Sequence, residues 1–325
     1  MKHLSKMPLK MVTKDYDHVA PLACGDVIVE GVDLTFERDT ANALNRTMGD
    51  ASFGAGELSL GRHLIRLARE DYSFVGIPVF PTRSFRHRCF FVRRDSGLHS
   101  FEQLVGKRIG SDEWPATGNT WSRAFLRDHG VRIEGISWWV GSVDGAPVTR
   151  SQGDLPSYVQ VATSKNLLSM LLAGDLDALM CPTPPKGFYE SGSPVVRLYP
   201  DFRRAESEYY NRSGIFPPHH IIGVRRNVYD KDPWVLRSLF LAFEKSKQLW
   251  RASRRSLTES TPWMLAEIED ATALLGEDWS PYGIEPNRKA VQALCDELFA
   301  QGLNPQRLDG AIAFTEFEKV MRIHG

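Results

Sequence analysis

Two stretches of the sequence decide the fold prediction: His87-Arg88-Cys89-Phe90-Phe91-Val92-Arg93-Arg94 and His219-His220-Ile221-Ile222-Gly223-Val224-Arg225-Arg226. Each begins with histidine, continues through apolar and β-prone residues as a buried strand does, and ends on Val-Arg-Arg. A chain that passes twice between two lobes needs two such strands. We therefore predict a two-lobed protein in which both stretches are crossover strands, with His87 and His219 facing a cleft between the lobes.

Length and charge agree with this prediction. The chain has 325 residues, more than one hydrophobic core usually covers, and 42% of them are hydrophobic, so each of two lobes can bury a core. Lysine plus arginine equals aspartate plus glutamate, 40 of each, which argues against a nucleic-acid-binding protein, because such proteins usually carry an excess of basic residues. We expect a small ligand or another protein as the partner, and neither nucleic acid nor membrane.

The location of the protein is predicted from two missing signals. No stretch reaches the roughly 18 apolar residues that span a bilayer, and residues 1–14 lack the apolar core and cleavage site of a secretory signal. We therefore expect a cytoplasmic protein. Its four cysteines, Cys24, Cys89, Cys181 and Cys295, show no CxxC spacing and are expected to be reduced core thiols.

Strand-like and helix-like segments alternate along the chain, as in α/β lobes with largely parallel sheets. Strands are predicted at residues 9–16, 31–36, 74–81, 106–111, 136–140 and 174–180, helices at 40–48, 62–69, 116–128, 164–173, 233–251, 263–275 and 288–301, and a surface loop at 142–157. The last three helices should pack back on the first lobe. The predicted first lobe is therefore discontinuous, residues 1–88 and 222–325, and the second lobe is residues 89–221.

Several segments, in collinear order, resemble a single family. They are residues 56–60 (Gly-Glu-Leu-Ser-Leu), 77–87 (Ile-Pro-Val-Phe-Pro-Thr-Arg-Ser-Phe-Arg-His), 199–202, 209–217 (Tyr-Tyr-Asn-Arg-Ser-Gly-Ile-Phe-Pro) and 279–288. In these residues the chain resembles the 4,5-dihydroxyphthalate decarboxylases, which share the fold of type II periplasmic solute-binding proteins. The resemblance implies a ligand cleft between two α/β lobes. It also implies non-oxidative decarboxylation of a hydroxylated aromatic acid, most closely 4,5-dihydroxyphthalate to protocatechuate.

Decarboxylation of a phenolic ring needs an acid that protonates the ring carbon, a base for the phenol and an anchor for a carboxylate. Histidine can give or take a proton near neutral pH, so His87 and His219 are predicted to be catalytic, unless they only hydrogen-bond within a strand end. Glu57 is the third candidate, because burial can keep a carboxyl group protonated; alternatively, it is a helix-start carboxylate. If the segment is a strand, His220 points to the opposite face from His219, and it is therefore the weaker catalytic candidate of the two.

Five residues are predicted to contact the substrate: Ser59, Arg83, Trp114, Thr117 and Asn119. Ser59 can donate a hydrogen bond, and the guanidinium of Arg83 can grip a carboxylate unless it is simply solvated. Residues 111–120 lie between a strand and a helix, where free N–H groups can receive a carboxylate. Thr117 and Asn119 can instead only cap that helix. Trp114 can stack on an aromatic ring.

No cofactor is expected. His87, His219 and Glu57 could together bind a divalent metal, but no HxH or HExxH spacing supports one, and arginine can stabilise the same charge. A non-catalytic binding protein for an aromatic acid or a thiamine-precursor-like ligand is the alternative function, because the fold does not separate the two. Trp250, Trp263 and Phe299 favour a homodimer.

Overall fold

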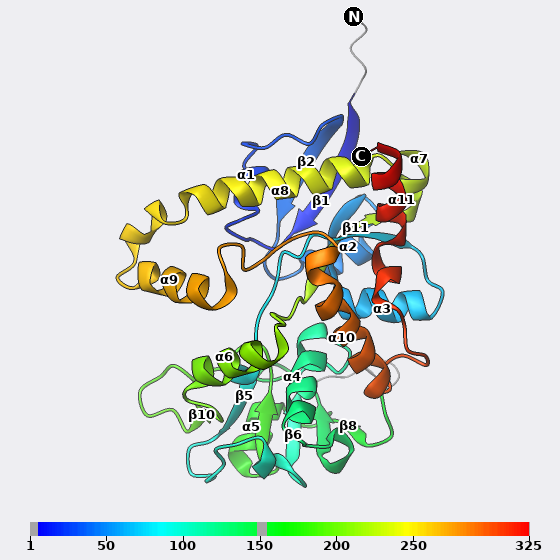
Figure 1. The fold of residues 1–325 in the computed structure, drawn as a ribbon. Helices are drawn as coiled ribbons and strands as arrows, with labels where there is room; N and C mark the ends of the chain where they lie inside the picture. The colour runs from blue at the N-terminus through cyan, green and yellow to red at the C-terminus, as the bar shows by residue number, and fades with distance from the viewer. Residues whose placement is uncertain (1–5, 148–154, 325) are drawn as a thin grey trace, which may run out of the picture. The chain divides into compact units, whose positions relative to one another are not determined.

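The computed structural model describes residues 6–147 and 155–324; parts of the N-terminal segment 1–14 and of the predicted loop 142–157 lie outside them. The chain divides into two compact units. Unit 1 comprises Met1–Arg83, Pro218–Cys295 and Leu308–Gly325, and unit 2 comprises Ser84–Pro217 and Asp296–Arg307. Each unit contains one sheet with helices, so the α/β prediction is confirmed for both (Figure 1).

The residues at which the chain passes from one unit to the other differ from the predicted ones. The chain leaves unit 1 after Arg83 and returns at Pro218, slightly earlier than predicted at both points, and Asp296–Arg307 joins unit 2. Arg83 and Pro218 form an isolated antiparallel bridge, so the outgoing and returning segments pair with each other. Each stretch predicted to cross between lobes therefore lies within one unit.

Unit 1 contains a five-stranded sheet in the order β2-β1-β3-β11-β4. Its strands are β1 (Met7–Thr13), β2 (Val32–Arg38), β3 (Ala55–Ser59), β4 (Phe74–Ile77) and β11 (His220–Arg225). β1 pairs in parallel with β2 and β3, whereas β11 is antiparallel to β3 and β4. The N-terminal end of β11 consequently lies at the same sheet edge as the C-terminal ends of β3 and β4.

Unit 1 also contains helices. They are α1 (Ala20–Ala23), α2 (Ala43–Gly49), α3 (Leu60–Ala68), α7 (Arg226–Lys231), α8 (Val235–Ser253), α9 (Met264–Leu275), α11 (Thr315–His324) and the first part of α10 (Arg288–Ala300). α8 crosses the sheet and buries Leu236, Leu239 and Phe243 (Figure 1). All of α9 is described and none of its residues is buried, contrary to the expectation that it packs on the first lobe.

Unit 2 contains a six-stranded sheet in the order β10-β5-β9-β6-β7-β8. Its elements are β5 (Phe90–Arg93), β6 (Arg108–Ser111), β7 (Ser137–Val140), β8 (Val159–Val161), β9 (Ala178–Met180), β10 (Val195–Arg197), α4 (Thr117–Asp128), α5 (Leu167–Ala173) and α6 (Phe202–Ser213). Phe91, Leu167, Leu171 and Leu179 belong to its hydrophobic core. The segments predicted at 106–111, 116–128, 136–140, 164–173 and 174–180 are confirmed as β6, α4, β7, α5 and β9. The short edge strands and α6 were not predicted.

Two sequence-based expectations concern membranes and thiols. Within the described part of the chain, no helix combines the length and apolarity needed to span a bilayer. All four cysteines are free thiols. Cys89, Cys181 and Cys295 are buried as predicted, whereas Cys24 is exposed, so the core prediction is wrong for Cys24.

Candidate active site

Polar side chains gather at one edge of the unit 1 sheet. Tyr16 and His18 follow the C-terminal end of β1, Glu57 lies near the C-terminal end of β3, Thr82 follows β4, and His220 begins β11. The carboxyl ends of parallel strands are where open α/β sheets bind their ligands. The antiparallel direction of β11 brings the start of that strand to the same edge.

Glu57 is the centre of this group. Its side chain is 0% exposed, and both carboxylate oxygens are occupied. Oε1 accepts hydrogen bonds from the Tyr16 hydroxyl and is 2.5 Å from His220 Nδ1, and Oε2 accepts from the Lys14 backbone N–H at 2.7 Å. Burial raises the pKa of Glu57, but His220, Tyr16 and the Lys14 amide outweigh it and lower that pKa below its ordinary value. The carboxyl group is therefore ionised, which contradicts its predicted role as a proton donor.

His220 is the accessible member of the pair, with its side chain 16% exposed. Pairing between β3 and β11 explains its place: Ser59 is opposite His220 and Glu57 is opposite Ile222, so Glu57 and His220 are diagonal neighbours on one face. A carboxylate on Nδ1 holds the imidazole in the tautomer that carries its proton there, and this leaves Nε2 as the nitrogen for a substrate. The pair can therefore transfer protons.

His219 is the neighbour of His220, and the alternation of an extended chain places its side chain on the other face. It immediately precedes β11, its side chain is buried, and its backbone carbonyl accepts a hydrogen bond from the Leu60 N–H at 2.9 Å. The imidazole that lies against Glu57 is that of His220, so the face with Glu57 belongs to His220. The prediction ranked His219 ahead of His220, whereas the structure places His220 beside Glu57. A difference of one residue is enough to reverse the face in an extended chain.

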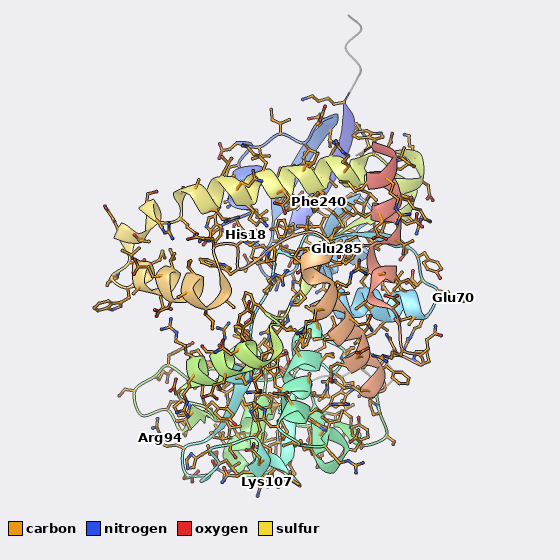
Figure 2. All side chains as sticks on the ribbon, viewed as in Figure 1. His18, Glu70, Arg94, Lys107, Phe240 and Glu285 are labelled. Atoms are coloured by element: carbon orange, nitrogen blue, oxygen red, sulfur yellow. The ribbon has the colours of Figure 1, made fainter. Side chains whose placement is uncertain are left out.

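Tyr16 links the carboxylate to the next strand. Its hydroxyl donates to Glu57 and is hydrogen-bonded to the Thr82 hydroxyl. Burial and the negative charge of Glu57 raise the pKa of Tyr16 far above its ordinary value, so the phenol stays protonated. His18 lies beside α8 (Figure 2), where its backbone carbonyl accepts a hydrogen bond from the Ser246 hydroxyl. Its ring stacks on the Tyr16 ring, with the centroids 5.6 Å apart. Neither Tyr16 nor His18 was predicted, although polar residues directly after a parallel strand are the available signal.

Comparison with curated proteins identifies relatives. A 4,5-dihydroxyphthalate decarboxylase of Comamonas testosteroni is 34% identical over 321 residues, covering 96% of this chain and 97% of that protein. A 4,5-dihydroxyphthalate decarboxylase of Pseudomonas putida is 33% identical over 213 residues, covering 64% of this chain and 83% of that protein. The chain belongs to the 4,5-dihydroxyphthalate decarboxylase family. No family model matches the sequence.

Solved structures place this decarboxylase-family chain in a known fold. The periplasmic aliphatic sulphonate binding protein of Escherichia coli is 15% identical, with a TM-score of 0.54 over 94% of this chain and 97% of that chain. A Candida albicans protein with the generic periplasmic binding protein fold is 11% identical, with a TM-score of 0.53 over 97% of this chain and 95% of that chain. At these identities the similarity concerns the fold alone, and it confirms the predicted fold class.

The structure gives His87 a different setting from the predicted one. This residue lies in unit 2, fully buried, with its ring stacked on Phe125 at 4.2 Å and near Phe101 and Tyr209. Neither ring nitrogen has a hydrogen-bond partner among the described residues. Burial lowers the pKa of His87 to about 3, so the ring is neutral at physiological pH. A neutral imidazole enclosed by aromatic rings is a core residue of this decarboxylase-family chain, which contradicts the predicted proton donor.

Replacing His87 by phenylalanine is therefore expected to change kcat/KM by less than about tenfold, well below the usual loss of a general acid. It should also flatten the pH dependence of stability. The pKa of His87 in the folded protein is below its ordinary 6.5, so the unfolded chain binds the proton first, and wild-type stability falls as pH falls from 6.5 toward about 3. Urea unfolding at pH 7 and pH 5 measures this slope; equal slopes for both proteins would contradict the assignment.

Ser59 and Arg83 have structural partners in unit 1. Ser59 is the N-cap of α3 and accepts a hydrogen bond from the Arg62 N–H. Arg83 Nη2 donates to the Pro281 carbonyl at 2.9 Å and to the Asn287 side chain, and the guanidinium lies 5.0 Å from the Phe80 ring centroid. Burial lowers the pKa of Arg83 to about 10, so it remains a cation. The helix cap and the loop contacts account for these two residues without a substrate.

The remaining predicted contacts lie in unit 2. Trp114 is fully buried between the Arg123 guanidinium, 3.9 Å from its ring, and Trp138, so the predicted stacking on a ligand is wrong. The Asn119 amide donates to Ser111, Asp112 and the Glu113 carbonyl, and so holds the loop before α4 together. Thr117 is the buried first residue of α4, whose N-cap is Ala116 without a side-chain bond. Neither predicted cap therefore caps this helix.

The predicted metal ligands are not gathered in one unit. Glu57 and His219 belong to unit 1 and His87 to unit 2. Across residues 6–147 and 155–324, no group of three or more His, Cys, Asp or Glu side chains is arranged to hold a metal ion. The residues at the candidate site of this family member fit proton transfer by a carboxylate–imidazole pair.

Proposed function

We propose that the protein decarboxylates 4,5-dihydroxyphthalate without oxidation, producing protocatechuate and CO2. The observation that carries this proposal is the full-length similarity to the Comamonas testosteroni decarboxylase. The Glu57–His220 pair supports it, because the reaction needs a positioned group that moves protons at neutral pH. The group that anchors a substrate carboxylate remains a prediction.

In the proposed mechanism His220 is the general base and Glu57 positions it. Nε2 accepts the proton of the ring hydroxyl that is para to the departing carboxylate, and the Glu57 charge stabilises the resulting imidazolium. The phenolate electrons then move toward the carbon that bears the carboxylate. That carbon takes up a proton from water, its bond to the carboxylate carbon breaks, and the electrons of that bond restore the aromatic ring. The imidazolium of His220 then returns its proton to the phenolate oxygen. One proton is taken up for each CO2 released.

Product analysis tests the proposal. Purified protein incubated with 4,5-dihydroxyphthalate should release CO2 and accumulate an equal amount of protocatechuate, measured by chromatography and mass spectrometry. Because proton transfer by His220 uses no cofactor, the rate should be the same with and without a metal chelator. Binding without product would favour the non-catalytic binding protein instead. Loss of the rate with chelator would assign a metal to the reaction.

A cytoplasmic location and a homodimer remain proposals. Of the residues that favoured the homodimer, Trp263 is 76% and Phe299 45% exposed. Trp250 instead packs inside unit 1, with its ring 6.0 Å from that of Trp279 and 5.9 Å from that of His18. Light scattering of the purified protein, compared with a Trp263→Glu variant, tests the homodimer: a dimer that this variant dissociates supports it, and a monomeric wild type contradicts it.

A further inference from the structure

Two buried polar atoms close to the Glu57–His220 pair lack a hydrogen-bond partner among the described residues. They are Nε2 of His18 and the hydroxyl of Tyr282. Tyr282 is only 5% exposed, so its hydroxyl is removed from bulk water. A buried polar atom without a partner costs about 1–3 kcal/mol, and the great majority of such atoms in proteins are paired. Other buried atoms, the ring nitrogens of His87 among them, also lack such a partner, but these two lie beside the candidate site.

Ring contacts connect both atoms to the candidate site. The His18 ring stacks on the ring of Tyr16, and the Tyr16 hydroxyl donates to the carboxylate that holds His220. The Tyr282 ring lies 6.3 Å from the His18 ring, centroid to centroid. The negative charge of Glu57 acts on both groups: its own contribution to the pKa of His18 and to the pKa of Tyr282 is an increase. The two unpaired atoms thus border the same group of side chains as His220, all within unit 1.

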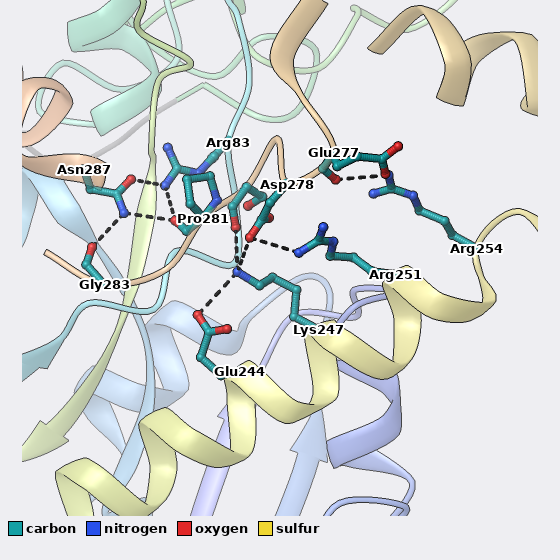
Figure 3. Close-up of polar contacts among 11 residues, drawn as sticks. Arg83, Glu244, Lys247, Arg251, Arg254, Glu277, Asp278, Pro281, Gly283 and Asn287 are labelled. Atoms are coloured by element: carbon teal, nitrogen blue, oxygen red, sulfur yellow. Dashed lines mark hydrogen bonds and ion pairs between the residues drawn. The ribbon is translucent and has the colours of Figure 1, made fainter. Parts of the chain in front are cut away.

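Ionic and backbone contacts hold the residues next to Tyr282 in place; Figure 3 shows those of Lys247 with Asp278 and of Arg83 with Pro281. Lys247 Nζ lies 3.1 Å from Asp278 Oδ2, donates to the Ser280 carbonyl at 3.2 Å, and is 4.1 Å from the Tyr282 ring centroid. The two residues adjacent to Tyr282 are also held: Arg83 donates to the Pro281 carbonyl, and the Gly283 N–H donates to the Pro78 carbonyl at 2.8 Å. These contacts fix the backbone on both sides of Tyr282 in the chain, so its hydroxyl is preorganised for recognition of a ligand.

Both groups are uncharged at neutral pH. Burial and the nearby Lys247 lower the pKa of His18 to about 4, against a weaker opposite effect of Glu57 and Asp278. Burial and neighbouring carboxylates raise the pKa of Tyr282 well above its ordinary value. A neutral imidazole has one donor and one acceptor, and a phenol can both donate and accept. Their natural partner is an uncharged hydroxyl group rather than a carboxylate.

We infer that His18 and Tyr282 recognise the second ring hydroxyl of the substrate, adjacent to the hydroxyl that His220 deprotonates. The pair would then select a catechol, a ring with two neighbouring hydroxyls, over a ring with one. This inference rests on the proposed function. A substrate without the second hydroxyl would leave both buried atoms unpaired, and sites of this kind reject such analogues strongly.

The test compares 4,5-dihydroxyphthalate with 4-hydroxyphthalate, which keeps one hydroxyl para to a carboxylate. Tyr282→Phe removes a single oxygen, and His18→Phe keeps a ring to stack on Tyr16. The ratio of kcat/KM for the two substrates should fall about tenfold in each variant, the usual effect of one lost hydrogen bond. Tyr229→Phe makes the same chemical change beyond the opposite end of β11, where the Tyr229 hydroxyl donates to Glu316, and should keep the wild-type ratio.

The outcomes separate the inference from the proposed function. A wild-type ratio in Tyr282→Phe overturns the inference, whatever happens to His18→Phe. If the wild type is inactive on 4,5-dihydroxyphthalate, the proposed function fails, and calorimetric binding of protocatechuate and of 4-hydroxybenzoate decides the inference. Protocatechuate should then bind more tightly to wild type, and Tyr282→Phe should reduce that preference about tenfold. An unchanged preference would again overturn it.

Discussion

Replacing His220 by alanine is expected to lower kcat/KM for 4,5-dihydroxyphthalate by about 10²–10⁴-fold, the usual contribution of a general base. The physical reason is that both oxygens of Glu57 are already occupied, so the proposed mechanism assigns the hydroxyl proton to Nε2 of His220. Glu57→Gln should also lower kcat/KM. The glutamine side chain carries no negative charge to stabilise the imidazolium of His220, and its NH2 group can donate to Nδ1 and so favour the other tautomer. Initial rates of product formation give both values.

Two controls make the His220 result specific. His219→Gln changes the preceding residue on the opposite face and should lower kcat/KM by less than about tenfold. Added imidazole should restore part of the rate of His220→Ala, which a merely structural role would not allow. Activity of His220→Ala within tenfold of wild type, in a folded protein, would contradict the mechanism.

Arg123→Ala should have the largest effect on stability, lowering the free energy of unfolding by about 3–5 kcal/mol. The Arg123 side chain is fully buried in unit 2, where Nε donates to Gln301 Oε1 at 2.7 Å and Nη2 donates to the Trp114 carbonyl at 2.8 Å. Its loss leaves a cavity beside the Trp114 ring and two acceptors without donors. Arg123 also connects α4 to the Asp296–Arg307 segment, so that segment should become more accessible to protease.

Arg127→Ala is the matched control for Arg123→Ala. Arg127 lies one turn further along α4, and its guanidinium is 3.5 Å from Glu297, also in the Asp296–Arg307 segment. Its side chain is 36% exposed, so this ion pair should contribute less than about 1 kcal/mol. Urea unfolding of both variants gives the comparison. Equal destabilisation by the two substitutions would contradict the interpretation that Arg123 is a central contact of unit 2.

Much of the fold could be predicted because local patterns report local structure. The alternation of apolar residues placed β6, β7 and β9 and the helices α4, α5 and α8 close to their observed bounds. The three-residue edge strands β8 and β10 were not predicted. The passages between the units were placed too late, since the pairing of Arg83 with Pro218 depends on residues far apart in the sequence.

The candidate site was predicted less well than the fold, and the reason is geometric. Glu57 was chosen correctly as a residue of this edge, but its partners decided that it is ionised. A side chain's face in a strand depends on register, and register is set by the neighbouring strand. Trp114 was assigned to a ligand because its sequence neighbours are loop residues, yet Arg123 and Trp138 enclose it.

The sequence by itself determined the family, the α/β class and most of the helices and strands, because these follow from motifs and from periodicity along the chain. Only the tertiary structure decided that His220 rather than His219 meets Glu57, that His87 is a buried neutral ring, and that His18 and Tyr282 lie beside the site. Those facts depend on strand register, burial and the charge of distant residues. Such effects arise only when the chain has folded.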